Sequence, residues 1–135
     1  MRVSLWLVPA LVVLCAALGL GGARFLAAPS VVRDLSSVPP GGGLAVAVFT
    51  VEGLKCVDTA ERAAAQLEGV PGVVRFTAYA SRNRAEIAFD PAIASVDGMR
   101  KAIEGPVHDK ESGEYLFGVY SVIEINGARV PQRRR

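Results

Sequence analysis

One thiol in the folded part of this chain stands where it could do chemistry. Cys56 lies in the stretch Val51 to Glu61, VEGLKCVDTAE, where an apolar run stops at Gly53 and an alanine-rich helical pattern follows. An ionised thiol binds soft metal ions and attacks electrophiles, whereas a neutral thiol is inert by comparison. The chemistry open to this stretch therefore depends on whether the neighbouring elements expose Cys56 and favour its thiolate.

The elements on either side of Cys56 predict a strand-to-helix loop. Residues 44–51, LAVAVFTV, are a short β-rich run between glycines, as expected of a buried or half-buried strand. Asp58, followed three residues later by Glu61, resembles a capping box, so we expect the helix to begin at about Val57 to Thr59. Cys56 would then lie beside unpaired backbone N–H groups and the positive end of the helix dipole, which both favour the thiolate. The alternative is a buried, inert cysteine packed as a small hydrophobe.

The only other cysteine, Cys15, lies in an apolar N-terminal segment, so we expect no disulfide within the domain. The segment Val3 to Gly22 carries no charged side chain and could cross a hydrocarbon core of about 30 Å as a helix. We expect residues 1–23 to be a signal anchor or a signal peptide. In either case the domain is expected outside the cytoplasm, periplasmic or extracellular, and it would be secreted if the leader is cleaved.

Composition divides the rest of the chain into a linker, one domain and a basic tail. Residues 24–43 are rich in Pro, Gly and Ser and poor in large apolar groups, which predicts a semi-stiff linker. Residues 44–130 hold nine Lys and Arg against twelve Asp and Glu, although the whole chain carries a formal net charge of +2. A nucleic-acid-binding domain would carry a basic face, so we expect no nucleic-acid partner. Within the tail, 131–135, the three terminal arginines are expected to be solvated or to touch an anionic surface.

Periodicity predicts a mixed α+β domain with alternating strands and helices. Alternation in residues 73–80 and 84–89, joined by the polar turn 81–83, predicts a hairpin. The remaining expected elements are a strand at 44–51, helices at 58–68 and 96–104 with Ser95 as the second N-cap, a long strand at 115–125, an Asn126-Gly127 turn and a short strand at 128–130.

The predicted order is β-α-β-β-α-β, which is the ferredoxin-like arrangement of two helices packed on one face of an antiparallel sheet. Alternating chain directions then bring the Cys56 loop, the turn 81–83 and the loop that holds His108 to one end of the sheet. We expect the functional site at that end.

Four segments of the chain resemble the heavy-metal-associated domain family. They are Gly53-Leu54-Lys55-Cys56-Val57-Asp58-Thr59, Val70-Pro71-Gly72-Val73, Ala85-Glu86-Ile87-Ala88-Phe89-Asp90-Pro91 and residues 95–104, in the same order and spacing as in that family. The resemblance spans about Ala45 to Val122. It implies a ferredoxin-like fold and a soft cation such as Cu(I), Zn(II) or Hg(II), held in typical members by two thiolates of a G-M-x-C-x-x-C loop.

The chain departs from that pattern inside the loop itself. Cys56 matches the first ligand, but Thr59 stands in place of the second cysteine and Leu54 in place of the usual methionine. A hydroxyl is a poor ligand for a soft ion, so this loop alone cannot supply the two-thiolate site.

Three hypotheses follow, from different classes of protein. The first is a metal-binding or metal-relay module that uses Cys56 with His108, or with Cys56 of a second copy; a metal transporter is the other expected partner. The second is a metal-silent module that keeps the fold and contacts a membrane partner. The third is an enzyme with Cys56 as nucleophile and His108 as base; since the sequence specifies no acidic residue to orient the base, we do not expect one.

Overall fold

The computed structural model describes residues 7–25, 28–36, 43–109 and 111–132, which form an α+β structure. The helices are α1 (Leu7–Phe25), α2 (Val57–Leu67) and α3 (Val96–Ile103), with a short 3-10 turn η1 (Ala80–Arg82). The strands are β1 (Val31–Asp34), β2 (Ala45–Glu52), β3 (Val73–Tyr79), β4 (Arg84–Phe89), β5 (Val107–His108), β6 (Tyr115–Leu116), β7 (Ser121–Ile125) and β8 (Ala128–Arg129). The predicted α+β class is confirmed.

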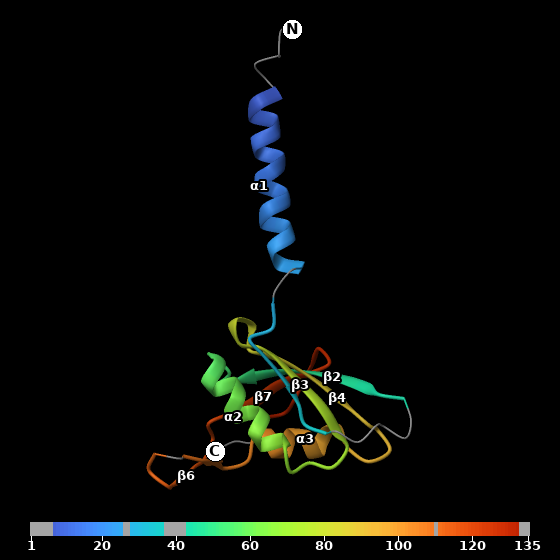
Figure 1. The fold of residues 1–135 in the computed structure, drawn as a ribbon, viewed down its shortest axis with the longest axis vertical. Helices are drawn as coiled ribbons and strands as arrows, with labels where there is room; N and C mark the ends of the chain where they lie inside the picture. Colours follow the sequence, from blue (N-terminus) through green and yellow to red (C-terminus); the bar gives the residue numbers. More distant parts are fainter. Residues whose placement is uncertain (1–6, 26–27, 37–42, 110, 133–135) are drawn as a thin grey trace.

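One antiparallel sheet of six strands forms the body of the domain, in the order β1-β3-β4-β2-β7-β8 (Figure 1). Strands β5 and β6 pair separately as a small two-stranded ribbon. The N–H of Val51, near the end of β2, donates to the carbonyl of Asn83 in the turn after β3 (2.7 Å). The Cys56 loop and the turn 81–83 therefore lie at the same end of the sheet, as predicted.

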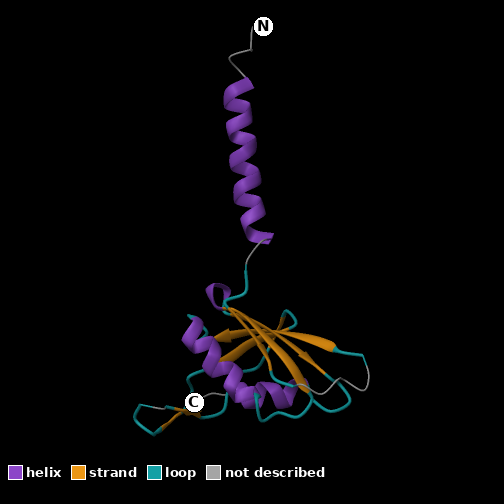
Figure 2. Cartoon of the chain, viewed as in Figure 1, coloured by secondary structure: helices purple, strands orange, loops and turns teal. Residues whose placement is uncertain are grey.

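The core lies between one face of the sheet and the helices α2 and α3, which Figure 2 shows along the same side of the strands. Alternate side chains of β2 and β4 point into it, as period two requires. Helix α2 contributes three alanines, Ala60, Ala63 and Ala64, which allow a close approach to the sheet, together with the larger Leu67. The largest fully buried side chains are Phe49, Phe76, Leu54, Leu67, Ile87 and Met99.

The hairpin and both helix positions agree with the sequence prediction to within one or two residues. Ser95 is the N-cap of α3, as predicted, and its Oγ accepts from the N–H of Gly98 (3.1 Å). The turn between β7 and β8 has positive φ at both Asn126 (51°) and Gly127 (80°), the geometry of the predicted type I′ turn.

In β3 the side chain of Val73 is buried and that of Val74 is not, because the pairing with β4 shifts register after Val73. The alternation predicted for residues 73–80, with the side chain of Val74 on the buried face, therefore holds only from Phe76 onward.

The linker prediction for residues 24–43 is wrong at β1. Residues Val31 to Asp34 pair with Ala78 to Arg75 and form the edge strand of the sheet. Long-range backbone pairing orders this segment although its composition is that of a linker, and Val31 packs against the core with Leu35. Residues 37–42 of the predicted linker lie outside the described residues.

The long strand predicted for residues 115–125 is also wrong, because two separate strands occupy this range. Gly118 has φ +69°, which a continuous strand cannot include, so the chain turns between β6 and β7. Tyr115 and Leu116 pair instead with His108 and Val107 of β5. This break creates the ribbon that carries His108.

Helix α1 covers most of the predicted anchor or signal segment and stands away from the sheet in Figure 1. Its side chains Val8 and Leu11 to Leu14 are exposed. Among the residues that the structure describes, no helix has the length and apolar character that a membrane span requires.

Candidate functional site

Two residues, Gly53 and Leu54, hold the loop between β2 and α2 in place. The side chain of Leu54 is fully buried in the core and anchors the loop there. Gly53 has φ +99°, and a Cβ added there would lie 2.3 Å from the carbonyl oxygen of Val119. The loop thus packs directly against the segment that leads into β7, and Cys56 follows it at the start of α2.

Cys56 is exposed and is the N-cap of α2, with extended backbone (φ −149°, ψ 179°). Its partner in a capping box is Thr59, the third residue of the helix. The Thr59 hydroxyl oxygen accepts from the backbone N–H groups of Lys55 and Cys56 (2.9 Å each), and the hydroxyl donates to the Cys56 carbonyl (2.9 Å). The predicted capping box of Asp58 and Glu61 is therefore wrong. Thr59, spaced three residues after Cys56, was the signal that could have revealed the true one.

The environment of Cys56 favours the thiolate. The backbone N–H of Thr59 and the Thr59 hydroxyl, whose oxygen is 3.6 Å from Sγ, lower the pKa of the Cys56 thiol below its usual value. Partial desolvation opposes this shift, the N–H of Asp58 adds to it, and the Asp58 carboxylate opposes it. The net effect agrees with the general rule that a helix N-terminus stabilises a thiolate.

Comparison with known protein families, curated proteins and solved structures yields no match for this chain. What the site can do therefore rests on its own geometry.

Tyr120 also lies at this end of the domain, although the sequence did not indicate it as part of the site. Its ring is buried, and its hydroxyl donates to the backbone carbonyl of Thr59 (2.6 Å), which ties the segment before β7 to the first turn of α2. Burial raises the pKa of Tyr120, the charge of Arg62 opposes the rise, and the negative charge of Cys56 adds to it. A tyrosine inside the predicted strand 115–125 was the available signal, since buried tyrosines usually hydrogen-bond through their hydroxyl.

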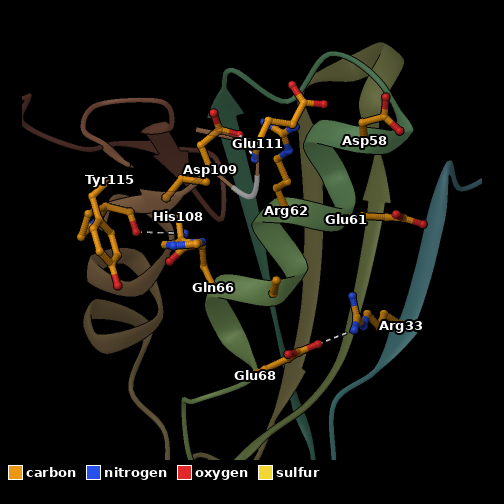
Figure 3. Close-up of a pocket in the computed structure, with 13 residues that line it drawn as sticks. Arg33, Asp58, Glu61, Arg62, Gln66, Glu68, His108, Asp109, Glu111 and Tyr115 are labelled. Atoms are coloured by element: carbon orange, nitrogen blue, oxygen red, sulfur yellow. Dashed lines mark hydrogen bonds and ion pairs between the residues drawn. The ribbon is translucent and has the colours of Figure 1, made fainter. Parts of the chain in front are cut away.

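His108 lies on β5, where its ring meets that of Tyr115 edge to face with centroids 5.1 Å apart. It is exposed and lines a cleft of about 670 Å³ along α2, together with Asp58 and Arg62 (Figure 3). The His108 ribbon therefore comes to the same helix as Cys56, but Cys56 is not among the residues that line the cleft.

The structure does not assemble Cys56 and His108 into a ready metal site. Within the described ranges no group of three or more His, Cys, Asp and Glu side chains could hold a metal ion. The Thr59 oxygen cannot complete one, because its hydrogen bonds to the loop backbone occupy it and because soft ions select sulfur over neutral oxygen. Within the described residues, this end of the domain presents one exposed thiol, that of Cys56, and its pKa is lowered.

Proposed function

We propose that residues 44–130 are a ferredoxin-like βαββαβ domain of the heavy-metal-associated kind, which takes up a soft metal ion as cargo through Cys56. The order of β2, α2, β3, β4, α3 and β7 along the chain supports the fold proposal, as does the strand order β3-β4-β2-β7. In this proposal β1, the β5–β6 ribbon and β8 are additions to that unit. The cargo is a copper-like or mercury-like ion, Cu(I), Hg(II) or Zn(II).

The observation that carries the metal proposal is the exposed Cys56 Sγ at the N-terminus of α2, with its pKa lowered. A thiolate in water-accessible surroundings is the donor that soft ions prefer. One thiolate alone holds such an ion weakly, so the proposal includes a second donor. Cys56 of a second copy, a donor on a metal transporter, or His108 of the same chain would supply it.

The proposed location is outside the cytoplasm, with the domain tethered through Val3 to Gly22 or released if the leader is cleaved. Its proposed partners are a metal transporter and a second copy of the chain. We propose neither an enzymatic activity nor a nucleic-acid partner.

The test is titration of the full chain with Cu(I) under reducing conditions, in a Cys15→Ala background so that Cys56 is the remaining thiol. Uptake that is lost in Cys56→Ala, with half an ion per chain, supports bridging between two copies. Uptake of one ion per chain that weakens in both Cys56→Ala and His108→Ala supports an intramolecular pair. Equal uptake with and without Cys56 overturns the proposal.

A second candidate function is a metal-silent interaction module, and the capping box favours it. Thr59 begins α2 through hydrogen bonds with the backbone of Lys55 and Cys56, so a structural role accounts for Thr59 without any ion. If the folded chain takes up no Cu(I) at all, this candidate replaces the first.

A further inference from the structure

The cleft along α2 has a floor and two walls, which come from distant parts of the sequence. Its floor is the solvent side of α2, one wall is β1 with Arg33, and the other is the ribbon of β5 and β6 with His108 and Tyr115 (Figure 3). The ion pair between Arg33 and Glu68 closes one end. A volume of about 670 Å³ is large enough for several side chains of a peptide segment.

The charges that line this cleft are predominantly negative. Once the Arg33–Glu68 pair is set aside, four carboxylates remain, those of Asp58, Glu61, Asp109 and Glu111, against the single guanidinium of Arg62 among the described lining residues. Hydrogen bonds from Ser112 and from the backbone hold the pKa of Asp109 below its usual value, so this carboxylate is charged at neutral pH. The cleft therefore has room and charge for a segment that carries about three positive charges.

Hydrogen bonds connect the end of the described chain to the segment before Pro106, which lines this cleft. The side-chain amide of Gln132 donates to the carbonyl of Val122 (2.8 Å), and the N–H of Val122 donates to Glu104 Oε1 (3.0 Å). Glu104 stands two residues before Pro106, which lines the cleft. The side chain of Gln132 is thus linked through two hydrogen bonds to the side chain of Glu104, which precedes the segment that lines the cleft.

We propose that this cleft is the docking site of the chain's own arginine segment, Arg133 to Arg135. Three extended residues span about 10 Å, and their three positive charges match the excess of three carboxylates over guanidinium groups among the described lining residues. Attachment at Gln132 gives the segment a high effective concentration at the cleft, so several individually weak ion pairs hold it at low ionic strength. This contact is independent of metal uptake.

The test is zero-length cross-linking of the full chain after the triple replacement Arg133→Lys, Arg134→Lys and Arg135→Lys. A carbodiimide joins a lysine amine to a carboxylate in direct contact, so mass spectrometry identifies what the tail touches. We expect links from the introduced lysines to Glu61, Glu111, Asp58 or Asp109 within one chain. Raising the salt to 1 M shortens the screening length to about 3 Å and is expected to reduce these links about fivefold.

The control is a matched pair of neutralising variants in the same lysine background. Glu61→Gln with Glu111→Gln is expected to reduce the tail links, whereas Glu86→Gln, on the opposite face of the sheet, leaves them unchanged. Equal circular dichroism melts show that the variants are folded. Tail links that are absent at low salt, or spread over Glu86 as much as over the cleft, overturn the proposal. So do links found only between isotopically labelled and unlabelled chains, since they place the tail on a neighbouring molecule.

Discussion

The N-termini of the two domain helices, α2 and α3, are capped by hydrogen bonds from different atoms. At α3 the Ser95 hydroxyl itself accepts from the N–H of Gly98, so the capping residue uses up its side chain. At α2 the capping residue is Cys56, whose sulfur is a weak acceptor, and the stronger hydrogen bonds are made by Thr59 from inside the helix. The difference shows that α2 begins securely without relying on the sulfur, which leaves Sγ available to solvent and to a ligand.

The largest expected effect on stability is that of Gly53→Ala, in the loop before α2. The positive φ and the close carbonyl of Val119 leave no space for a Cβ, so we expect a loss of about 3 kcal/mol in the free energy of unfolding. The control is Gly98→Ala in the first turn of α3. There a Cβ would meet the flexible Ser95 Oγ at 3.0 Å, and the helix propensity gained is about 1 kcal/mol. Urea unfolding measures both, and equal losses would show that the two helix starts are equally constrained.

Next in size is Thr59→Ala, which removes the acceptor for two backbone N–H groups. We expect a loss of about 1–2 kcal/mol in the free energy of unfolding, compared with about 1 kcal/mol for Ser95→Ala. Thr59→Ser keeps the hydroxyl and should retain most of the stability. If Thr59→Ala were as stable as the parent, the cap of α2 would have to come from Cys56 after all.

The third test is the pH dependence of Cys56 alkylation by iodoacetamide, measured in a Cys15→Ala background. Because the folded-state pKa of Cys56 is lowered, the rate should rise at a lower pH than for a thiol in an unfolded peptide, and Thr59→Ala should shift the profile back upward. The lowered pKa of Cys56 also makes the free energy of unfolding depend on pH. The thiolate stabilises the fold at pH values above the unfolded pKa, and this contribution is lost as pH falls through the folded pKa. A profile unchanged by Thr59→Ala would contradict the assigned cause.

The smallest expected effect is that of Cys56→Ser on stability. Serine is a better N-cap than cysteine, so the unfolding midpoint should stay the same or rise slightly, while alkylation at this position disappears. Thermal melts and mass spectrometry check both statements. A clear loss of stability would show that the sulfur itself is needed to begin α2.

The elements that sequence reasoning placed well are those whose signal is local. The alternation in β4 and the Ser95 cap of α3 are read from a few adjacent residues, and both are correct in the structure. Strand β1 was missed because Val31 and Val32 are a weak apolar pair, and they are ordered by pairing with β3 more than forty residues away.

The candidate site was predicted in part, for similar reasons. Exposure of Cys56 at a helix start followed from the strand, the glycine and the alanine-rich pattern. The cap was assigned to Asp58 because aspartate is a far commoner N-cap than cysteine. Tyr120 and the cleft beside His108 depend on how the chain turns at Gly118, which periodicity could not reveal.

The edge strand β1 is also the part of the sheet that follows directly from the N-terminal helix along the chain. Tension applied through α1 would act first on Ser30, whose N–H donates to Ala78 and whose hydroxyl accepts from Ala80. These two hydrogen bonds stand at the end of β1 nearest α1, so the load reaches them before the rest of the pairing with β3. If the N-terminus is anchored, β1 is the first strand of the sheet to carry that load, and its release would lengthen the tether while β2, β3, β4 and β7 stay paired.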